Sequence, residues 1–280
     1  MASCVFCGKN NVKMTDEHVF GDWISRYFIK ELGVELKGVA EIVDADGRVT
    51  QFPTTPFQQK VKIVCKPCNE GWMSTLEASV IDLLKPMMIG KSVMLRNNAK
   101  KRLAFWCAKT AFVLDHLHPH NRVVPDSHFH ELFDRQRALN SQVILVAYRS
   151  VTKEAPGQLL ASALKQPVVN IQIPTDSFPS IAEEVQKHVA DGRLMYKITF
   201  AIGNFVALVF GHDLPMSMNV NSPRPIARHI WPINQRFRWS SELSIDQIGG
   251  LPAFHAAFGP SQTDTMPDNV PGKVDTGTSA

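Results

Sequence analysis

Four cysteines have the most specific spacing in this chain. They form two Cys-x2-Cys pairs, and two intervening residues allow a tight turn to bring both sulfurs of a pair to one metal ion. Gly8 and Pro67 suit such turns. Zinc prefers four soft or nitrogen ligands in a tetrahedron, so the pattern predicts one structural zinc ion; the alternative is two unrelated pairs of buried thiols. The predicted ligands are Cys4, Cys7, Cys65 and Cys68.

Three polar residues accompany these cysteines. Glu17 and His18 lie between the two pairs, and Asn69 directly follows the last cysteine. Since four cysteines leave zinc no open position, any catalysis must come from residues that the zinc holds in place. Carboxylate and amide oxygens suit Mg²⁺ or Mn²⁺, and a neutral histidine can accept a proton from water. The alternative is a capping carboxylate and a packed histidine.

This order of residues resembles the HNH nucleases of the His-Me finger superfamily, especially their zinc-stapled kind, over about residues 1–90. The resemblance implies a ββα-metal module that hydrolyses DNA, with His18 as the general base and Glu17 and Asn69 as ligands of one catalytic Mg²⁺ or Mn²⁺ ion. It also suggests a role in phage defence or DNA processing. Many members have aspartate where this chain has Glu17, and a basic residue near Gly71-Trp72-Met73. A non-catalytic zinc-stapled module that binds nucleic acid or protein is the alternative.

The elements that must position these residues follow from periodicity. An apolar stripe predicts a helix over Asp22–Leu32, ended by Gly33. Alternation over residues 34–64 predicts short strands around a turn at 44–47. Apolar residues three or four apart predict a second helix from Asn69 to Pro86.

The rest of the chain predicts an α+β domain with long helices and an antiparallel sheet. We expect domains at 1–95 and 96–260, with a disordered tail at 261–280. Residues 91–102 are predicted to be a basic connection, with Lys100, Lys101 and Arg102 meeting the DNA backbone. The predicted helices cover 103–117, 127–138 and 181–189, and the strands 143–148, 168–173, 194–200 and 205–210.

Composition limits the function classes only loosely. The net charge of +4 is too small to argue for a nucleic-acid partner by itself. No apolar run approaches the ~18 residues of a membrane span, and the first residues do not resemble a secretory signal. We therefore expect a cytoplasmic protein without a membrane partner. For residues 96–260 we consider substrate choice, signal sensing, formation of a homo-oligomer or an unrelated enzyme activity.

Overall fold

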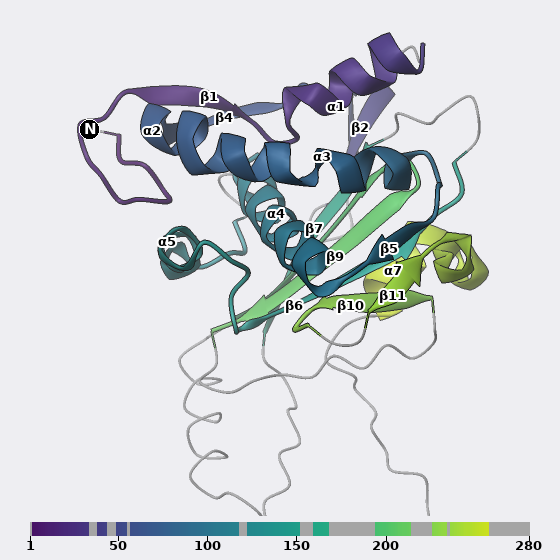
Figure 1. Cartoon of the computed structure of the whole chain (residues 1–280). Coiled ribbons are helices and arrows are strands. Elements are labelled where there is room, and N and C mark those ends of the chain that lie inside the picture. Colours follow the sequence, from purple (N-terminus) through teal and green to yellow (C-terminus); the bar gives the residue numbers. More distant parts are fainter. Residues whose placement is uncertain are drawn as a thin grey trace, which may run out of the picture.

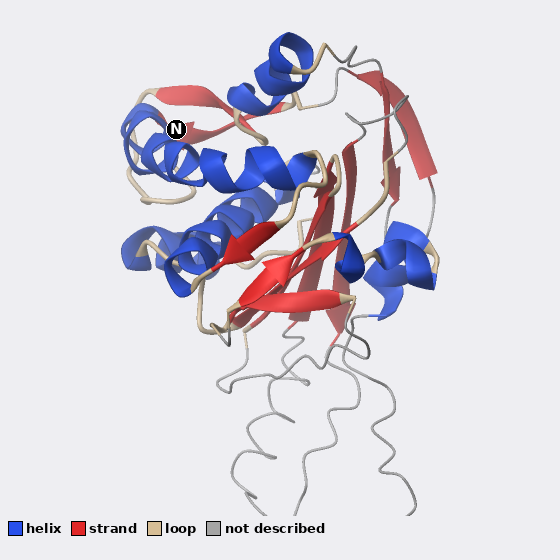
Figure 2. Cartoon of the chain, turned by 45° about the vertical axis from the view of Figure 1, so that its right-hand side comes forward, coloured by secondary structure: helices blue, strands red, loops and turns tan. Residues whose placement is uncertain are grey.

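The computed structural model describes residues 2–33, 38–43, 49–54, 57–117, 122–151, 159–167, 194–213, 226–233 and 236–257. The fold is α+β, as predicted: helices pack against a five-stranded antiparallel sheet, with an N-terminal unit at one edge of the molecule (Figures 1 and 2).

The N-terminal unit is built on a two-stranded antiparallel ribbon. Strand β1 (Met14–His18) pairs with β4 (Lys60–Cys65), and a bulge interrupts the register between Thr15 and Glu17. The sequence did not predict β1, because its residues are mostly polar and show no apolar alternation. The predicted strands farther along are confirmed as β2 (Gly38–Val43) and β3 (Val49–Thr54), which form a hairpin. The predicted turn at 44–47 lies outside the described residues.

Both helices predicted in this unit are present with shifted ends. The first consists of α1 (Asp22–Arg26) and a π-helical turn, η1 (Tyr27–Glu31), and Gly33 follows with φ +65°. The second begins earlier than predicted, running through α2 (Lys66–Cys68), the π-helical η2 (Asn69–Met73) and α3 (Ser74–Met88). Pro86 lies inside α3 and not at its end. A proline removes one hydrogen bond of a helix, and here the helix ends two residues later.

The predicted basic connection at 91–102 is wrong. These residues contain strand β5 (Val93–Leu95) and the start of helix α4 (Asn97–Asp115). Strand β5 pairs with β11 (Phe237–Trp239), so the chain returns to this point from far along the sequence. The boundary predicted near residue 95 falls at β5, and one buried apolar core extends from the N-terminal unit to the sheet across it.

The large sheet has the order β10-β6-β9-β8-β7. Its strands are β6 (Gln142–Tyr148), β7 (Leu159–Pro167), β8 (Leu194–Ile202), β9 (Phe205–His212) and β10 (Ala227–Trp231). The predicted hairpin between β8 and β9 is confirmed, and Gly203 turns it with φ +55°. The sequence missed β7 and β10. The strand predicted at 168–173, the helix at 181–189 and the tail at 261–280 lie outside the described residues.

Helices cover both faces of this sheet. Helix α4 packs on one face, with α5 (Asp126–Arg135) near its C-terminal end. The 3₁₀ turn η4 (Ser241–Leu243) lies beside β6. The 3₁₀ turn η5 (Ile245–Ile248) and α7 (Gly250–Ala257) belong to a smaller apolar cluster that includes the opposite side chains of β6 and β9.

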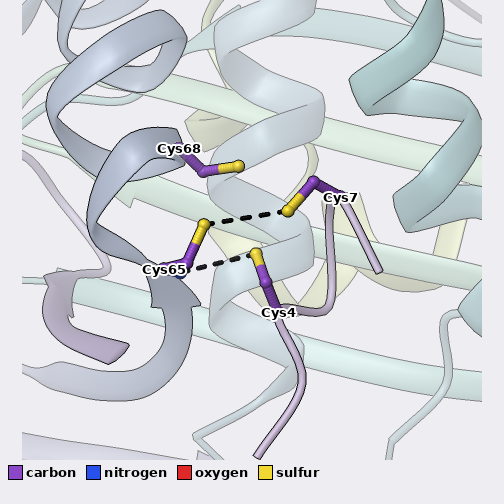
Figure 3. Close-up of side chains that lie close together, drawn as sticks. All are labelled: Cys4, Cys7, Cys65 and Cys68. Atoms are coloured by element: carbon purple, nitrogen blue, oxygen red, sulfur yellow. Dashed lines mark hydrogen bonds between the residues drawn. The ribbon is translucent and has the colours of Figure 1, made fainter. Parts of the chain in front are cut away.

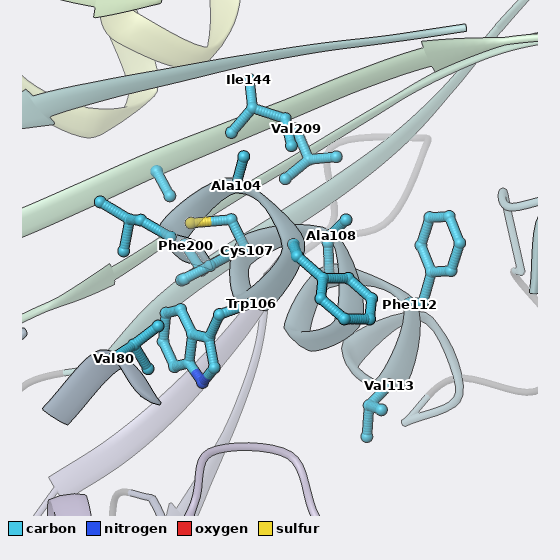
Figure 4. Close-up of a cluster of buried hydrophobic side chains, with 14 of the residues drawn as sticks. Val80, Ala104, Trp106, Cys107, Ala108, Phe112, Val113, Ile144, Phe200 and Val209 are labelled. Carbon is cyan, nitrogen blue, oxygen red and sulfur yellow. The ribbon is translucent and has the colours of Figure 1, made fainter. Parts of the chain in front are cut away.

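Helix α4 is the centre of the main core. Trp106, Cys107 and Phe112 are fully buried. Figure 4 shows Trp106 beside Val80 of α3, with Ile144 and Val209 of the sheet on the other side of α4. Cys107 is therefore a core residue far from the other cysteines in sequence and separate from their cluster. Because α4 supports both the sheet and α3, the N-terminal unit is held by the same core as the rest of the described chain.

Candidate metal centre and adjacent polar residues

The four predicted ligands meet at one point (Figure 3). Their sulfur atoms all lie within 4.8 Å of one another, and they form the one group of three or more His, Cys, Asp or Glu residues within such reach among the described residues. The Cys7 and Cys65 Sγ atoms are 3.7 Å apart. Zinc–sulfur bonds of about 2.3 Å in a tetrahedron place sulfurs about 3.8 Å apart, so the cluster has the dimensions of a four-thiolate metal site.

Each pair of cysteines is shaped by its local backbone. In the first turn, the Gly8 N–H donates to the Cys4 carbonyl at 2.9 Å, and Gly8 has φ +67°, which favours glycine. The second pair spans the end of β4 and the start of α2, with Pro67 in the first helical turn. The Cys65 N–H lies 3.4 Å from Cys4 Sγ, joining the two turns. The sequence therefore shapes each pair, and the β1–β4 ribbon brings the pairs together.

Aromatic packing ties this centre to the helices. Phe6, between the first two cysteines, is fully buried with its ring 5.4 Å from Trp72 and 5.3 Å from Phe129 of α5. The Phe6 carbonyl lies 3.0 Å from Nδ1 of His130. Trp72 also stacks on Phe105 of α4 at 5.4 Å. Loss of the four-cysteine cluster would therefore weaken the packing of α4 and α5 against the N-terminal unit.

Asn69 has a fixed amide orientation. Its Nδ2 donates to Thr15 Oγ1 at 3.0 Å, and that hydroxyl donates to the Val64 carbonyl at 3.1 Å. Because the hydroxyl proton is used on Val64, Thr15 can only accept from Asn69, which assigns the amide nitrogen. Among the described residues no donor bonds Asn69 Oδ1, the atom that a hard cation would take.

Glu17 lies in a buried charged cluster that also contains Lys109 and Glu77. Its Oε1 accepts from Lys109 Nζ at 3.4 Å, and the same ammonium donates to Glu77 Oε1 at 2.7 Å. Burial raises the pKa of Glu17, Lys109 opposes that shift, and the charge of Glu77 adds to it. Lys109 is fully buried, and its two carboxylate neighbours hold its pKa above the usual value despite burial. With all three groups ionised, two carboxylates and one ammonium leave one net negative charge.

Glu77 on α3 accepts the most hydrogen bonds among the three residues of this cluster. Besides Lys109, it accepts from the indole N–H of Trp23 at 2.7 Å and of Trp106 at 2.8 Å. These donors come from α1 and α4, so one carboxylate joins three helices. The lone lysine in the apolar run of α4 was the sequence signal for this cluster, since a fully buried lysine needs an acidic partner. Sequence reasoning missed Lys109, Glu77 and Thr15.

His18 ends β1 and is partly exposed, with 26% of its side chain accessible. Its Nε2 lies 4.0 Å from Asp22, and its strand partner is Lys60. Burial lowers the pKa of His18, and the charge of Lys60 lowers it further while Asp22 opposes. A lowered pKa leaves the imidazole neutral near pH 7, the form that can accept a proton.

The predicted DNA contact at Lys100 is wrong. Lys100 is fully buried, and its Nζ lies 5.0 Å from the centre of the Phe237 ring, because β11 returns over the start of α4. Arg102 donates to the Ser79 carbonyl at 2.6 Å and lies 3.9 Å from Asp82, so α3 holds it. Lys101 is exposed on α4, and its contact with DNA stays a prediction.

Comparisons with known protein families, with functionally characterised proteins and with solved structures found no match for this chain. Within the described residues, no helix is both long and apolar enough to cross a membrane.

Proposed function

We propose that the four cysteines bind one structural zinc ion and that the unit they hold is a metal-dependent HNH endonuclease acting on DNA. In this proposal His18 is the general base, and Glu17 and Asn69 hold one Mg²⁺ or Mn²⁺ ion. The observation that supports it most is the gathering of these groups on one short ribbon. Asn69 is tied to Thr15, which lies two residues before Glu17 on β1, and His18 ends that strand.

In this proposal the ribbon would bring Asn69 and Glu17 to one ion. The Asn69 amide is bonded to Thr15, which lies two residues before Glu17, and a bulge separates these two residues of β1. The net negative charge of the Glu17, Lys109 and Glu77 cluster would attract a cation to Glu17. The oriented Asn69 Oδ1 would supply a second hard ligand.

The chemistry would divide among these groups in a simple way. Neutral His18 would accept a proton from a water molecule as the water oxygen bonds to phosphorus and the bond from phosphorus to the leaving oxygen breaks. When bound, the divalent ion would stabilise the charge on the leaving oxygen. Lys109, which is itself held by Glu77, would hold Glu17 in place.

A non-catalytic zinc module is the second candidate. The contact between Glu17 and Lys109 favours it, because a buried ion pair is also what a purely structural glutamate would form. In that case His18 and Asn69 would stabilise the ribbon without binding a second ion.

Cleavage of plasmid DNA with added Mg²⁺ or Mn²⁺ separates the two candidates. We expect His18→Ala to retain its zinc and its circular dichroism spectrum and to lose about a hundred- to ten-thousand-fold in rate, the usual contribution of a general base. A folded His18→Ala protein that cleaves at the wild-type rate would refute the mechanism. A wild-type protein that never cleaves would favour the non-catalytic module.

A further inference from the structure

The outer face of the β1–β4 ribbon carries exposed lysines next to His18. Lys60 is the strand partner of His18, and directly opposed side chains lie on the same face of a sheet. Lys62 is two residues farther along β4, and its neighbours Val61 and Ile63 pack against the main core, so the exposed Lys62 lies on the outer face although the register shifts here. Both lysines are exposed, whereas Val64 and Cys65 at the end of β4 are buried.

Positive charge dominates this part of the surface. The ribbon and its zinc end, residues 9–18 and 60–70, carry five exposed lysines and two exposed acids, Asp16 and Glu70. Glu70 lies 3.5 Å from one of these lysines, Lys66. Neither Lys60 nor Lys62 forms an ion pair with another described residue. The five lysines are Lys9, Lys13, Lys60, Lys62 and Lys66.

The ribbon is also placed to meet a large partner. It lies at the edge of the molecule, beside α2 and away from the five-stranded sheet, in both views (Figures 1 and 2). The start of α4, where the sequence predicted DNA contacts, instead has Lys100 buried under Phe237.

We propose that the outer face of the β1–β4 ribbon is the DNA-binding surface, with Lys60 and Lys62 contacting backbone phosphates beside the one that faces His18. This inference rests on the proposed function. It adds the direction in which the DNA backbone crosses the N-terminal unit, which is along β4. Lysines that form no ion pair within the described part of the chain can exchange their counterions for phosphates without breaking one there. Binding through them would be independent of base sequence and strongly dependent on salt.

The test measures DNA binding without cleavage. Full-length, zinc-loaded His18→Ala protein is titrated into a fluorescent short duplex DNA at several salt concentrations, with and without the additional pair Lys60→Ala and Lys62→Ala. Each lost phosphate contact should reduce the slope of log affinity against log salt by about 1, so the pair should reduce it by about 2. Lys91→Ala, an exposed lysine after α3, is the matched control and should leave the slope unchanged.

Three results would overturn the inference in distinguishable ways. If the parent binds DNA and the double variant keeps the same affinity and slope, the ribbon is not the surface, and the proposed nuclease function stands. If the parent binds a matched RNA duplex but not DNA, the partner is wrong. If the parent binds neither nucleic acid, the proposed function fails with the inference. Circular dichroism and zinc content of the double variant exclude loss of folding as the cause.

Discussion

Replacing Glu77 with glutamine should be among the most destabilising single substitutions in this protein. Glu77 accepts three hydrogen bonds, from Lys109 and from the indoles of Trp23 and Trp106, each at 2.7–2.8 Å. Glutamine has nearly the same shape but no charge and only one acceptor oxygen. The fully buried Lys109 ammonium would keep only the longer contact to Glu17 at 3.4 Å.

The expected loss follows from the burial of Lys109. Removing one partner of a buried ion pair costs about 3–5 kcal/mol, because the other charge remains in a low-dielectric interior. Glu17 compensates part of this, so we expect Glu77→Gln to lower the free energy of unfolding by about 3 kcal/mol. Domains of this kind are stable by about 5–15 kcal/mol, so the variant should remain folded but clearly weakened.

Urea unfolding of zinc-loaded protein, followed by circular dichroism and tryptophan fluorescence, gives this value. Glu70→Gln is the matched control, because Glu70 is exposed and its contact to Lys66 at 3.5 Å should contribute well under about 1 kcal/mol. Lys109→Met and the double variant complete a cycle, in which we expect the two residues to be coupled by at least about 2 kcal/mol. A loss below about 1 kcal/mol for Glu77→Gln, or additive effects in the cycle, would refute the view that Glu77 compensates the charge of Lys109.

Three further predictions concern metals and pH. Purified protein should contain about one zinc per chain, and a strong chelator should unfold the N-terminal unit; absence of zinc in elemental analysis would disprove the site. Asn69→Ala should abolish divalent-dependent plasmid cleavage with zinc content unchanged, and loss of zinc would instead make Asn69 structural. Burial lowers the pKa of Lys197 to about 8 from an ordinary 10.5. Between these two pH values the unfolded state therefore holds more protons than the folded state, so the free energy of unfolding should rise with pH. In Lys197→Met, measured by urea unfolding, this increase in the free energy of unfolding should be smaller by up to about 3 kcal/mol. A pH dependence equal to that of the wild type would show that Lys197 is not its source.

Local sequence determined the elements whose signals lie within a few residues. The two Cys-x2-Cys turns, the apolar stripe of Asp22–Leu32 and the alternation before and after Gly203 predicted the cysteine cluster, the first helix and the central hairpin correctly. Turn chemistry and side-chain periodicity act over one or two turns of chain, so they can be read without knowing what packs against them.

Tertiary structure alone decided what the polar residues contact. Strand β1 has little apolar alternation because Thr15 and Glu17 are satisfied by Asn69 and Lys109, residues 54 and 92 positions away. Lys100 was predicted to contact the DNA backbone, yet it is buried, with its Nζ over the ring of Phe237 in β11, far along the chain. The free energy of burying a charged side chain depends on the partners that the fold brings to it. These partners are distant in sequence, so the residues next to it do not show whether it is buried. The sequence by itself therefore specified the four-cysteine cluster, whereas the surroundings of Glu17 and Lys100 depended on the packing of α4 and β11.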